Sequence, residues 1–537
     1  MPPKGAKRRT ASPIGKTNGF GTKKVKHEAN GHGDDLRQPH PFAEDAEEHG
    51  IVLRRFYPHE MSNARAHAYN SDEIPRPMEV LITALEETGG VRKQVNVGEA
   101  VVHWFKMDLR HTDNRSLALA SAKAKEAGVP LICLYIVSPQ DFEAHLTAPV
   151  RVDFMLRTLS VLKADLAALD IPLYVETVDK RKKIPHRILE LMNEWGSNHL
   201  FANIEYEVDE LRREAQMIRH FAENNKSLEV VHDTCVVPPG ELRSGSGKQY
   251  AVYTPWYRAW MAHIHENLDL LELYDRPEKN PDGVRKKFEH LFDCRIPDAP
   301  KNKRLSDEEK KKFHALWPCG EHVAMSRLAD FCEEAIGSYH NKRNIPGDNV
   351  NWPYVCMNKP FKPEYSNIQW SYDKDHFAAW CEGRTGFPIV DAAMRQLNHM
   401  GYMHNRCRMI VASFISKDLL IDWRMGERYF MEHLIDGDFA SNNGGWGFSA
   451  SVGVDPQPYF RIFNPLLQSE KFDPNGEYIR KWVPELRGLS NKEIHDPYNR
   501  GAGTKAKKQG YPKQLVEHKG ARDRALSAYK GGLESGM

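Results

Sequence analysis

Short apolar runs alternate with longer amphipathic stretches between about residues 98 and 235. Runs of this length are typical of buried strands, and the stretches between them have helical spacing. Because strands and helices that alternate at this interval form a parallel sheet covered on both faces, we predict a doubly wound α/β domain over residues 98–235. The expected strands are Ala100–Phe105, Leu131–Val137, Ile171–Val175, His199–Ala202 and Leu228–Val231, and the expected helices are 115–128, 151–169, 185–195 and 207–224.

The hydrophobic pattern changes after residue 235. Residues 236–318 contain Pro238-Pro239-Gly240 and charged stretches, which are typical of a connection between domains. Residues 319–490 have helical character and few β-branched runs, so we expect an all-α domain there. The remaining segments show little periodicity, and we expect a disordered basic extension over residues 1–97 and a basic tail over residues 491–537.

Positive charge is concentrated at the ends of the chain. The net charge is only +2, yet residues 1–27 hold eight Lys and Arg without an acid, and residues 501–537 hold eight against three acids. Basic runs of this kind are solvated tails, nuclear addresses or electrostatic contacts for nucleic acid. An acid-free basic start is also compatible with mitochondrial targeting, so we rank the nucleus first and the mitochondrion second.

Composition argues against several classes of protein. The 537 residues contain no apolar run long enough to cross a bilayer and no apolar signal segment at the start, so no membrane partner is expected. The eight cysteines are scattered without a CxxC pair. Zinc sites and small disulfide frameworks need tighter spacing, so we predict free thiols in a reducing compartment and no metal.

The densest candidate chemistry begins at Asp436. Asp436 and Asp438 flank Gly437, and Asn442 and Trp446 follow within ten residues. Carboxylates accept hydrogen bonds from hydroxyl, imide and amine groups, and a glycine lets backbone approach a bound ring system closely. Ordered loops use the same residue types around capping acids. The residues alone therefore leave both a ligand site and a structural loop open.

Several motifs, taken in order, resemble those of the photolyase/cryptochrome family. The first is similar to the signature WFxxDLRxxDN, and the similarity covers about residues 98–485. It is greatest to fungal class I photolyases, which repair cyclobutane pyrimidine dimers in DNA. The motifs are Trp104–Asn114, Gly386–Leu397, Met403–Met409, Lys417–Arg424 and Asp436–Trp446.

The resemblance implies an α/β antenna domain followed by an all-α FAD-binding domain. It implies a carbon–carbon lyase that repairs DNA containing pyrimidine dimers by electron transfer from light-excited, reduced FAD. The cofactors would be FAD and a folate antenna, methenyltetrahydrofolate, and the protein would be a monomer. A cryptochrome-like blue-light photoreceptor or regulator is the alternative in another class, and a non-functional splice or gene-model variant is a further one.

The family's flavin residues map onto positions in the second half of the chain. Asn442 would lie opposite flavin N5, where an amide cannot easily release a proton, and this favours repair over signalling. The tryptophans would carry electrons to the flavin from the surface. The expected flavin-binding residues are Tyr339, Asn405, Arg408, Asp436, Gly437, Asp438 and Asn442, and the electron-transfer residues are Trp370, Trp423 and Trp446.

The resemblance also assigns residues to DNA and to the antenna. Asn405 stands where (6-4) photolyases carry a histidine acid, and cyclobutane dimers need no such proton donor. Arginines at family positions would contact phosphates or the lesion. The expected DNA-binding residues are Arg343, Asn405, Arg406, Met409, Phe448 and Arg461, and the expected antenna residues are Asp209, Glu210 and Cys356.

The chain departs from the family after Pro346. There the family has a Thr/Ser-rich turn that binds the flavin phosphates, and then helices that end in a Trp-x-x-Glu-x-x-Trp-Arg stretch lining flavin and lesion. This chain instead runs through residues 347–351 directly into the next recognisable segment. We therefore expect an internal segment of several dozen residues to be missing, with impaired cofactor binding as the consequence.

Overall fold

The computed structural model describes residues 68–69, 71–247, 249–332, 360–361, 363–454, 456 and 458–534. All of them belong to one compact unit, residues 40–537. No helix in these described ranges is both long and apolar enough to span a lipid bilayer.

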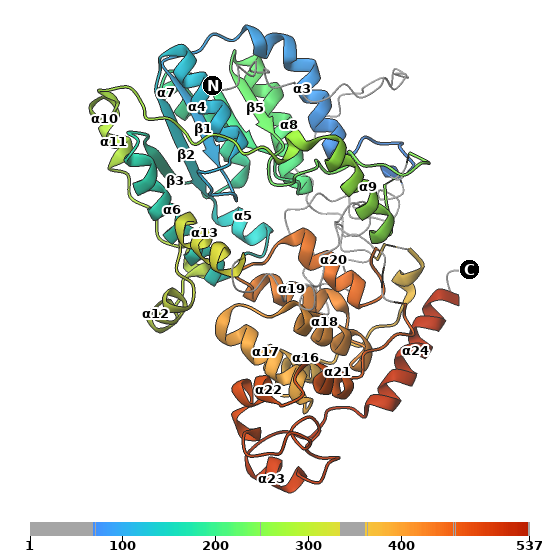
Figure 1. Ribbon diagram of the computed structural model, residues 1–537. Helices are drawn as coiled ribbons and strands as arrows, with labels where there is room; N and C mark the ends of the chain where they lie inside the picture. The colour runs from blue at the N-terminus through green and yellow to red at the C-terminus, as the bar shows by residue number, and fades with distance from the viewer. Residues whose placement is uncertain are drawn as a thin grey trace, which may run out of the picture. The chain divides into compact units, whose positions relative to one another are not determined.

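A five-stranded sheet forms the first part of the described chain (Figure 1). The strands pair in the order β3-β2-β1-β4-β5, and every pair is parallel. β1 and β2 are buried at every position, as expected for a parallel sheet with both faces covered. The strands are β1 Ala100–Phe105, β2 Leu131–Val137, β3 Leu173–Thr177, β4 Ser197–Asn203 and β5 Ser227–Val231.

Helices cover both faces of this sheet, so the predicted doubly wound α/β fold is confirmed. Alternate residues of β1 enter two separate cores: Val102 and Trp104 pack with α7 and α8, while Val101 and Phe105 pack with α4 and α6. The helices of this part are α3 Pro77–Gln94, α4 Arg115–Ala127, α5 Pro139–Ala144, α6 Pro149–Ala167, α7 Ile184–Glu194 and α8 Val208–Glu223.

The prediction of a disordered extension over residues 1–97 is wrong for its last part. Helix α3 packs against α8 and buries Leu81 and Ala84 completely. It contains Gly89-Gly90, and each glycine inside a helix costs about 1 kcal/mol relative to alanine, which hid the helical pattern. Tertiary burial of one face outweighs that local cost.

The predicted linker, residues 236–318, is also partly structural. Val284, Phe288 and Leu291 are buried in the core shared by α7 and α8. The Asn280 side chain accepts a hydrogen bond from Leu131 N at 2.8 Å and donates to Leu131 O at 2.8 Å, so it satisfies the backbone at the start of β2. The helical elements between residues 236 and 318 are α9 Tyr253–Glu266, η2 Leu268–Leu271, α10 Val284–Lys287, α11 Glu289–Phe292, η3 Lys301–Lys303 and α12 Asp307–Leu316. Helix α13 Glu321–Asp330 follows them.

The rest of the described chain is helical, which confirms the all-α domain (Figure 1). Its core is one cluster of buried side chains that extends from Ile368 to Tyr529 and draws on most of the helices between them. The elements are η5 Pro363–Asn367, α16 Lys374–Cys381, α17 Pro388–Met400, α18 Asn405–Ser413, the π-helix η6 Phe414–Asp418, α19 Trp423–His433, α20 Phe439–Ser449, α21 Pro465–Phe472, α22 Glu477–Trp482, η7 Pro484–Leu486, α23 Gly503–Lys508 and α24 His518–Glu534.

The prediction that residues 491–537 form a tail is wrong. Tyr511 and Tyr529 are buried, and their hydroxyls donate to Asp391 Oδ2 at 2.6 Å and to Ala450 O at 2.5 Å. Both bonds reach other helices of the all-α core. The helical domain therefore extends through α24 instead of ending near residue 490.

Candidate functional site

A tight turn joins α19 to α20 and carries the two candidate acids. Asp438 caps α20 by accepting a hydrogen bond from Ser441 N at 2.8 Å. The turn is tied to the preceding loop, since Ile435 N donates to Gly401 O at 2.8 Å. Gly437 packs close to the chain, where an added Cβ would lie 3.3 Å from Leu434 O. The turn therefore presents its carboxylates from a fixed backbone.

Arg408 on α18 makes a two-pronged ion pair with Asp436. Its Nη2 lies 2.9 Å from Oδ1 and 2.8 Å from Oδ2, and its Nε donates to Met403 O at 2.7 Å. The guanidinium carbon is 5.5 Å from the centre of the Tyr402 ring. Asp436, Met403 and Tyr402 together fix the position of the Arg408 side chain. The pair nevertheless remains accessible, with the Arg408 and Asp436 side chains 25% and 46% exposed. Such an arrangement can hold a polar ring system by charge-assisted hydrogen bonds.

The structure adds Arg151 to this charged group, a residue that the sequence did not single out. Burial lowers the pKa of Arg151, while the negative charges of Asp438, Glu207 and Asp436 act in the opposite direction. Arg151 is on α6, and Asp436 and Asp438 are nearly 290 positions further along the chain. No local pattern could have revealed this neighbourhood.

Two adjacent amides on α20 differ in their partners. Asn442 Nδ2 donates to Glu427 O at 2.9 Å and to Glu427 Oε1 at 3.0 Å. Asn443 is completely buried, and neither its Oδ1 nor its Nδ2 has a hydrogen-bond partner within the described part of the chain. A buried polar group without a partner costs about 1–3 kcal/mol. Asn443 therefore fits a site that a polar ligand completes, and it was missed because Asn442 had taken the ligand role in the sequence comparison.

The three candidate tryptophans belong to the same helical core. Trp423 and Trp446 are 3% and 2% exposed, and Trp370 is partly buried against the core. Gly426 makes room for the indole of Trp446, since a Cβ at Gly426 would lie 2.2 Å from its Cη2. The Trp446 ring contacts Trp380 at 6.1 Å between ring centres, which adds a fourth indole to the set.

The candidate DNA-binding residues are only partly brought together. Arg406 is partly buried, with its guanidinium carbon 4.6 Å from the centre of the Phe472 ring, and burial lowers its pKa. Asn405 begins α18, one turn from Met409, and both are partly accessible. Phe448 is partly buried on α20, and Arg461 is exposed beyond it. Tyr339, Arg343 and Cys356 lie outside the described residues.

The candidate antenna acids already have protein partners. Arg181 Nη2 lies 2.6 Å from Asp209 Oδ2 and 3.0 Å from Glu210 Oε1, and the two carboxylates are 8% and 5% exposed. Arg213 adds positive charge beside them, and, against the effect of burial, the nearby carboxylates raise the pKa of His145, which also lies next to these acids. These acids stabilise the start of α8, and a pigment would have to bind beside an ion-paired cluster.

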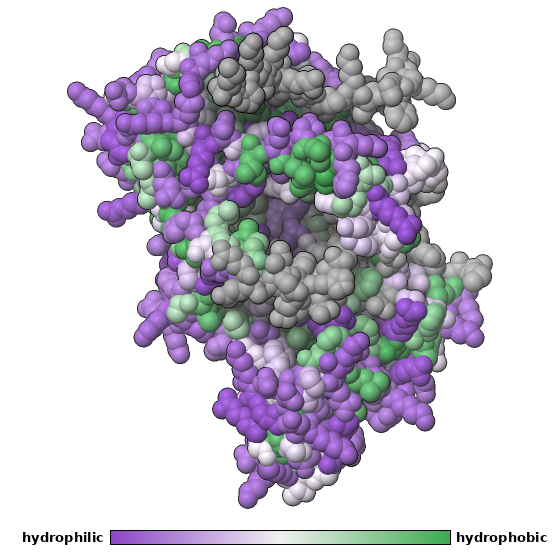
Figure 2. Space-filling view, in the orientation of Figure 1, coloured by the Kyte–Doolittle hydropathy of each residue, from purple (hydrophilic) through white to green (hydrophobic). Residues whose placement is uncertain are grey.

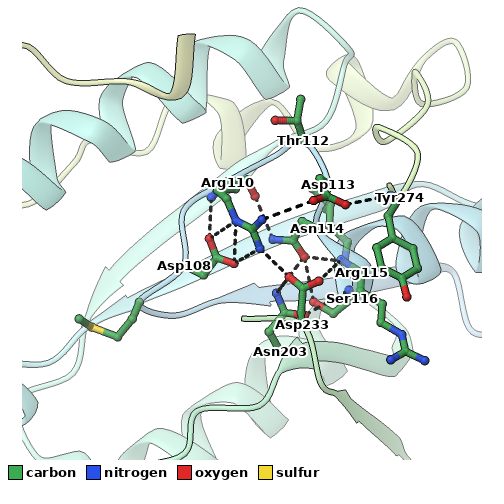
Figure 3. Close-up of polar contacts among 12 residues, drawn as sticks. Asp108, Arg110, Thr112, Asp113, Asn114, Arg115, Ser116, Asn203, Asp233 and Tyr274 are labelled. Carbon is green, nitrogen blue, oxygen red and sulfur yellow. Dashed lines mark hydrogen bonds and ion pairs between the residues drawn. The ribbon is translucent and has the colours of Figure 1, made fainter. Parts of the chain in front are cut away.

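The Asp108–Asn114 part of the first motif forms a polar network at the carboxyl ends of the strands (Figure 3). Arg110 Nη2 lies 2.8 Å from Asp108 Oδ2 and 2.7 Å from Asp233 Oδ2, while Asn203 Nδ2 donates to Asp233 and to Asn114 at 3.0 Å each. Asn114 in turn caps α4. From β1 the strand order continues through β2 and β3 on one side of the sheet, and through β4 and β5 on the other. The place between β1 and β4 is therefore the switch point of the sheet. The network holds the loops after β1, β4 and β5 together.

Comparison with protein families matches both halves of the chain. A family model described as DNA photolyase matches residues 101–276, and one described as the FAD binding domain of DNA photolyase matches residues 348–531. The second match contains the Arg408–Asp436 pair, Asn443 and the three tryptophans. It also runs through α23 and most of α24, in agreement with the extended helical domain.

Curated relatives and solved structures agree with these matches. The deoxyribodipyrimidine photo-lyase of Neurospora crassa is 62% identical over 569 aligned positions, covering 93% of this chain and 92% of the relative. The mitochondrial deoxyribodipyrimidine photo-lyase of Saccharomyces cerevisiae is 32% identical, covering 91% and 96%. A crystal structure of the class III photolyase of Agrobacterium tumefaciens superposes with a TM-score of 0.67 at 29% identity, covering 81% of this chain and 98% of that one.

Proposed function

This chain belongs to the DNA photolyase family, and we propose that it repairs cyclobutane pyrimidine dimers in DNA by a light-dependent, FAD-requiring reaction. The proposal is carried by the accessible Arg408–Asp436 pair, together with the unsatisfied, buried Asn443, inside the segment matched as an FAD-binding domain. Bound FAD would supply the excited electron that opens the dimer, which no side chain can supply.

The protein's own residues would bind and orient the flavin and the DNA. The Arg408 guanidinium and the Asp436 carboxylate would hold the flavin ring by hydrogen bonds, and the amide of Asn443 would gain the partner that it lacks. Asn442 has no acidic proton to give, so it would not serve as a proton donor to the flavin. Trp446, Trp423 and Trp370 would carry electrons inwards from the surface, as the resemblance implies. Arg406 and Arg461 would contact DNA phosphates.

We also propose that the chain lacks an internal segment next to residues 347–351. The alignment to the Neurospora relative spans 569 positions, more than the 537 residues of this chain, so the relative holds residues for which this chain has none. The segment would remove donors to the flavin phosphates and weaken FAD binding. Sequencing of transcripts across the codons for residues 340–360 tests this: a transcript with an added in-frame segment is expected, and its absence would contradict the proposal.

The function is tested with two proteins, this chain and a restored form that carries the Neurospora segment at the same position. Each is given FAD, reduced, and mixed with an oligonucleotide that contains a cyclobutane thymine dimer. We expect the restored form to remove dimers in blue light and not in the dark, and this chain to do so at least about tenfold more slowly, because it retains less flavin. A restored form that binds FAD without light-dependent repair would overturn the proposed function.

A matched pair of variants tests the flavin contact. Arg408→Ala in the restored form should lower FAD affinity by about tenfold or more, because charge-assisted hydrogen bonds contribute about 1.5–3 kcal/mol each. Arg428→Ala is the control, since Arg428 makes a comparable ion pair with Glu432 at 2.8 Å on α19, with side chains 31% and 34% exposed. Equal FAD affinity in the two variants would show that Arg408 does not bind flavin.

A folate antenna and a nuclear destination are further parts of the proposal. The folate, methenyltetrahydrofolate, would lie beside Asp209 and Glu210, whose charges Arg181 neutralises. Added folate should increase repair excited at near-ultraviolet wavelengths, and Arg181→Ala should reduce that increase. The basic N-terminal runs would direct the monomer to the nucleus, and fluorescence microscopy of a tagged chain separates this from the mitochondrial site that the name of the yeast relative states.

A further inference from the structure

A lysine amine and a cysteine thiol meet beside β3, the edge strand of the sheet. Lys163 Nζ on α6 lies 2.8 Å from Sγ of Cys294, which follows α11. The two residues are 131 positions apart in the sequence. Both α6 and α11 pack against β3 (Figure 1), so the fold itself brings the amine and the thiol together.

Shared hydrogen-bond acceptors hold this pair in place. Lys163 Nζ donates to Cys294 O at 2.5 Å and to Leu173 O, at the start of β3, at 3.4 Å. The Cys294 thiol donates to the same Leu173 oxygen at 3.2 Å. On either side of Cys294 the chain is anchored, since Leu291 is buried in one core of the α/β part and Ile296 packs against the other. The fold therefore fixes the separation of Nζ and Sγ.

Solvent reaches the Cys294 thiol. Cys294 is partly exposed between the exposed residues Asp293 and Arg295. Hydrophilic side chains dominate the area over α10 and α11 on the face shown in Figure 2, so water and small polar oxidants have access to it. In contrast, Cys133 is completely buried, and burial raises the pKa of the Cys407 thiol to about 11. Because the thiolate is the form that reacts with peroxide, we expect Cys133 and Cys407 to be inert.

We propose that Lys163 and Cys294 form a redox modification site, in which a peroxide links the two side chains by a covalent bond between Nζ and Sγ. The sulfur first attacks one peroxide oxygen: an S–O bond forms, the O–O bond breaks, and water leaves a sulfenic acid behind. Nζ, after the loss of one proton to solvent, then attacks the sulfur. An S–N bond forms, the S–O bond breaks, and the hydroxyl leaves as water with a proton from the nitrogen. The sulfur is oxidised by two electrons, and the peroxide is reduced to two waters.

The cross-link joins α6 to the segment after α11. A small movement of the flexible four-carbon lysine stem is enough to form the bond, because the two atoms are already in contact. Cross-links that close long loops stabilise a fold mainly by restricting the unfolded chain. The α/β part therefore gains stability on oxidation. Thiol reductants cleave the S–N bond and restore both side chains, so the modification is reversible.

Peptide mass spectrometry on the full chain, before and after treatment with hydrogen peroxide, tests this site. Trypsin does not cleave after a modified Lys163, so the expected product is peptide 158–180 joined to peptide 288–295. Its mass should be the sum of the two peptides less two hydrogens, and a thiol reductant should separate them. Cys133 and Cys407 should stay reduced in the same sample.

Two variants separate the amine of Lys163 from its charge. Lys163→Arg keeps the positive charge and the hydrogen-bond donors but has no primary amine, while Cys294→Ser removes the sulfur. In Lys163→Arg, peroxide should still give a sulfenic acid at Cys294, which dimedone traps, and no joined peptides should form. In Cys294→Ser neither product should form.

Thermal unfolding is the second readout. Peroxide should raise the unfolding midpoint of the α/β part by several degrees in the original chain and in neither variant, and a thiol reductant should reverse the rise. Oxidation of Cys294 to a sulfinic acid without joined peptides overturns the proposal, and so does an equal rise in the Lys163→Arg chain. These measurements need neither flavin nor DNA, so the proposed function stands or fails separately.

Discussion

The polar network around Arg110 in the α/β part is paired within itself, whereas α20 of the helical part carries a buried amide without a partner among the described residues. Arg110, Asp108 and Asp233 satisfy each other at the edge of the sheet. On α20, in contrast, the amide of Asn443 is buried without a partner in the described chain, and the nearby Asp436 carboxylate is 46% exposed. Buried polar groups are ordinarily paired, so the network around Arg110 is complete in itself, while the amide of Asn443 is available to a ligand.

The two parts also differ in how they use the end of the chain. The α/β core closes with α3, α8 and the segment Val284–Leu291, all within about 60 residues of its strands. The helical core closes only when α24, which begins about 150 residues after η5, packs against η5 and η6. The helical part should therefore be the more sensitive to changes at the C-terminus.

Removal of residues 491–537 should have the largest effect. The deletion takes away Tyr511 and Tyr529, two of the largest fully buried side chains, together with α24. We expect the helical part to lose cooperative unfolding while the α/β part stays folded, because none of the hydrogen bonds in the α/β core involves α24. Hydrogen exchange of peptides from each part measures this.

The control for that deletion ends the chain after Glu534 and keeps every described helix. It should behave like the full chain. If the larger deletion leaves exchange in α17 and α18 unchanged, residues 491–537 are a tail after all, as their charge suggested.

A matched pair of core substitutions should have the next largest effect. Trp380→Ala in the helical core and Phe221→Ala in the α/β core each empty a completely buried position. Such truncations cost about 3–5 kcal/mol. We expect each variant to lower the unfolding temperature of the part that contains it. Calorimetry measures this temperature.

Leu467→Ala is the control for this pair, since Leu467 is 59% exposed and its loss should cost less than about 0.5 kcal/mol. If Trp380→Ala and Phe221→Ala shift one common transition by the same amount, the two parts unfold together. The distinction between an independent α/β fold and a dependent helical fold would then be wrong.

The parts of the fold that could be predicted from the sequence are those with a clear local pattern of hydrophobic residues. The strands β1 and β2 were predicted to the residue because both are continuous apolar runs, buried at every position. Helix α24 was missed because Lys519, Arg522 and Arg524 mask the buried positions Ala521, Ala525 and Tyr529. A sparse apolar face on a charged helix gains its stability from the surface that it covers, which the local sequence does not show.

The candidate site also contains residues that the sequence could predict and residues that it could not. The Arg408–Asp436 pair followed from family motifs, and the structure brings the two side chains together. Arg151 and the partnerless amide of Asn443 could not be predicted, since both depend on distant segments meeting in space. The flavin and DNA roles of these residues stay predictions until binding is measured.

The smallest effect, and the finest test of the difference between the two parts, concerns Lys417 in the π-helix. Its side chain is completely buried, donates to Ser451 Oγ at 2.7 Å, and lies 4.4 Å from the centre of the Tyr529 ring. Burial lowers the pKa of Lys417 from its ordinary 10.5 to about 7, and the Asp418 charge opposes the shift. The unfolded chain then binds more protons than the folded one between pH 7 and 10.5, so the free energy of unfolding should fall as the pH falls through that range.

Lys417→Met removes the buried charge and should abolish this dependence. Urea unfolding at pH 7 and pH 9.5 should differ by about 2 kcal/mol more in the original chain than in the variant, allowing for partial relaxation of the buried group. Lys530→Met is the control, because Lys530 is 68% exposed on α24 and should leave the dependence unchanged. A pH dependence that survives Lys417→Met would show that the helical core accepts the charged lysine.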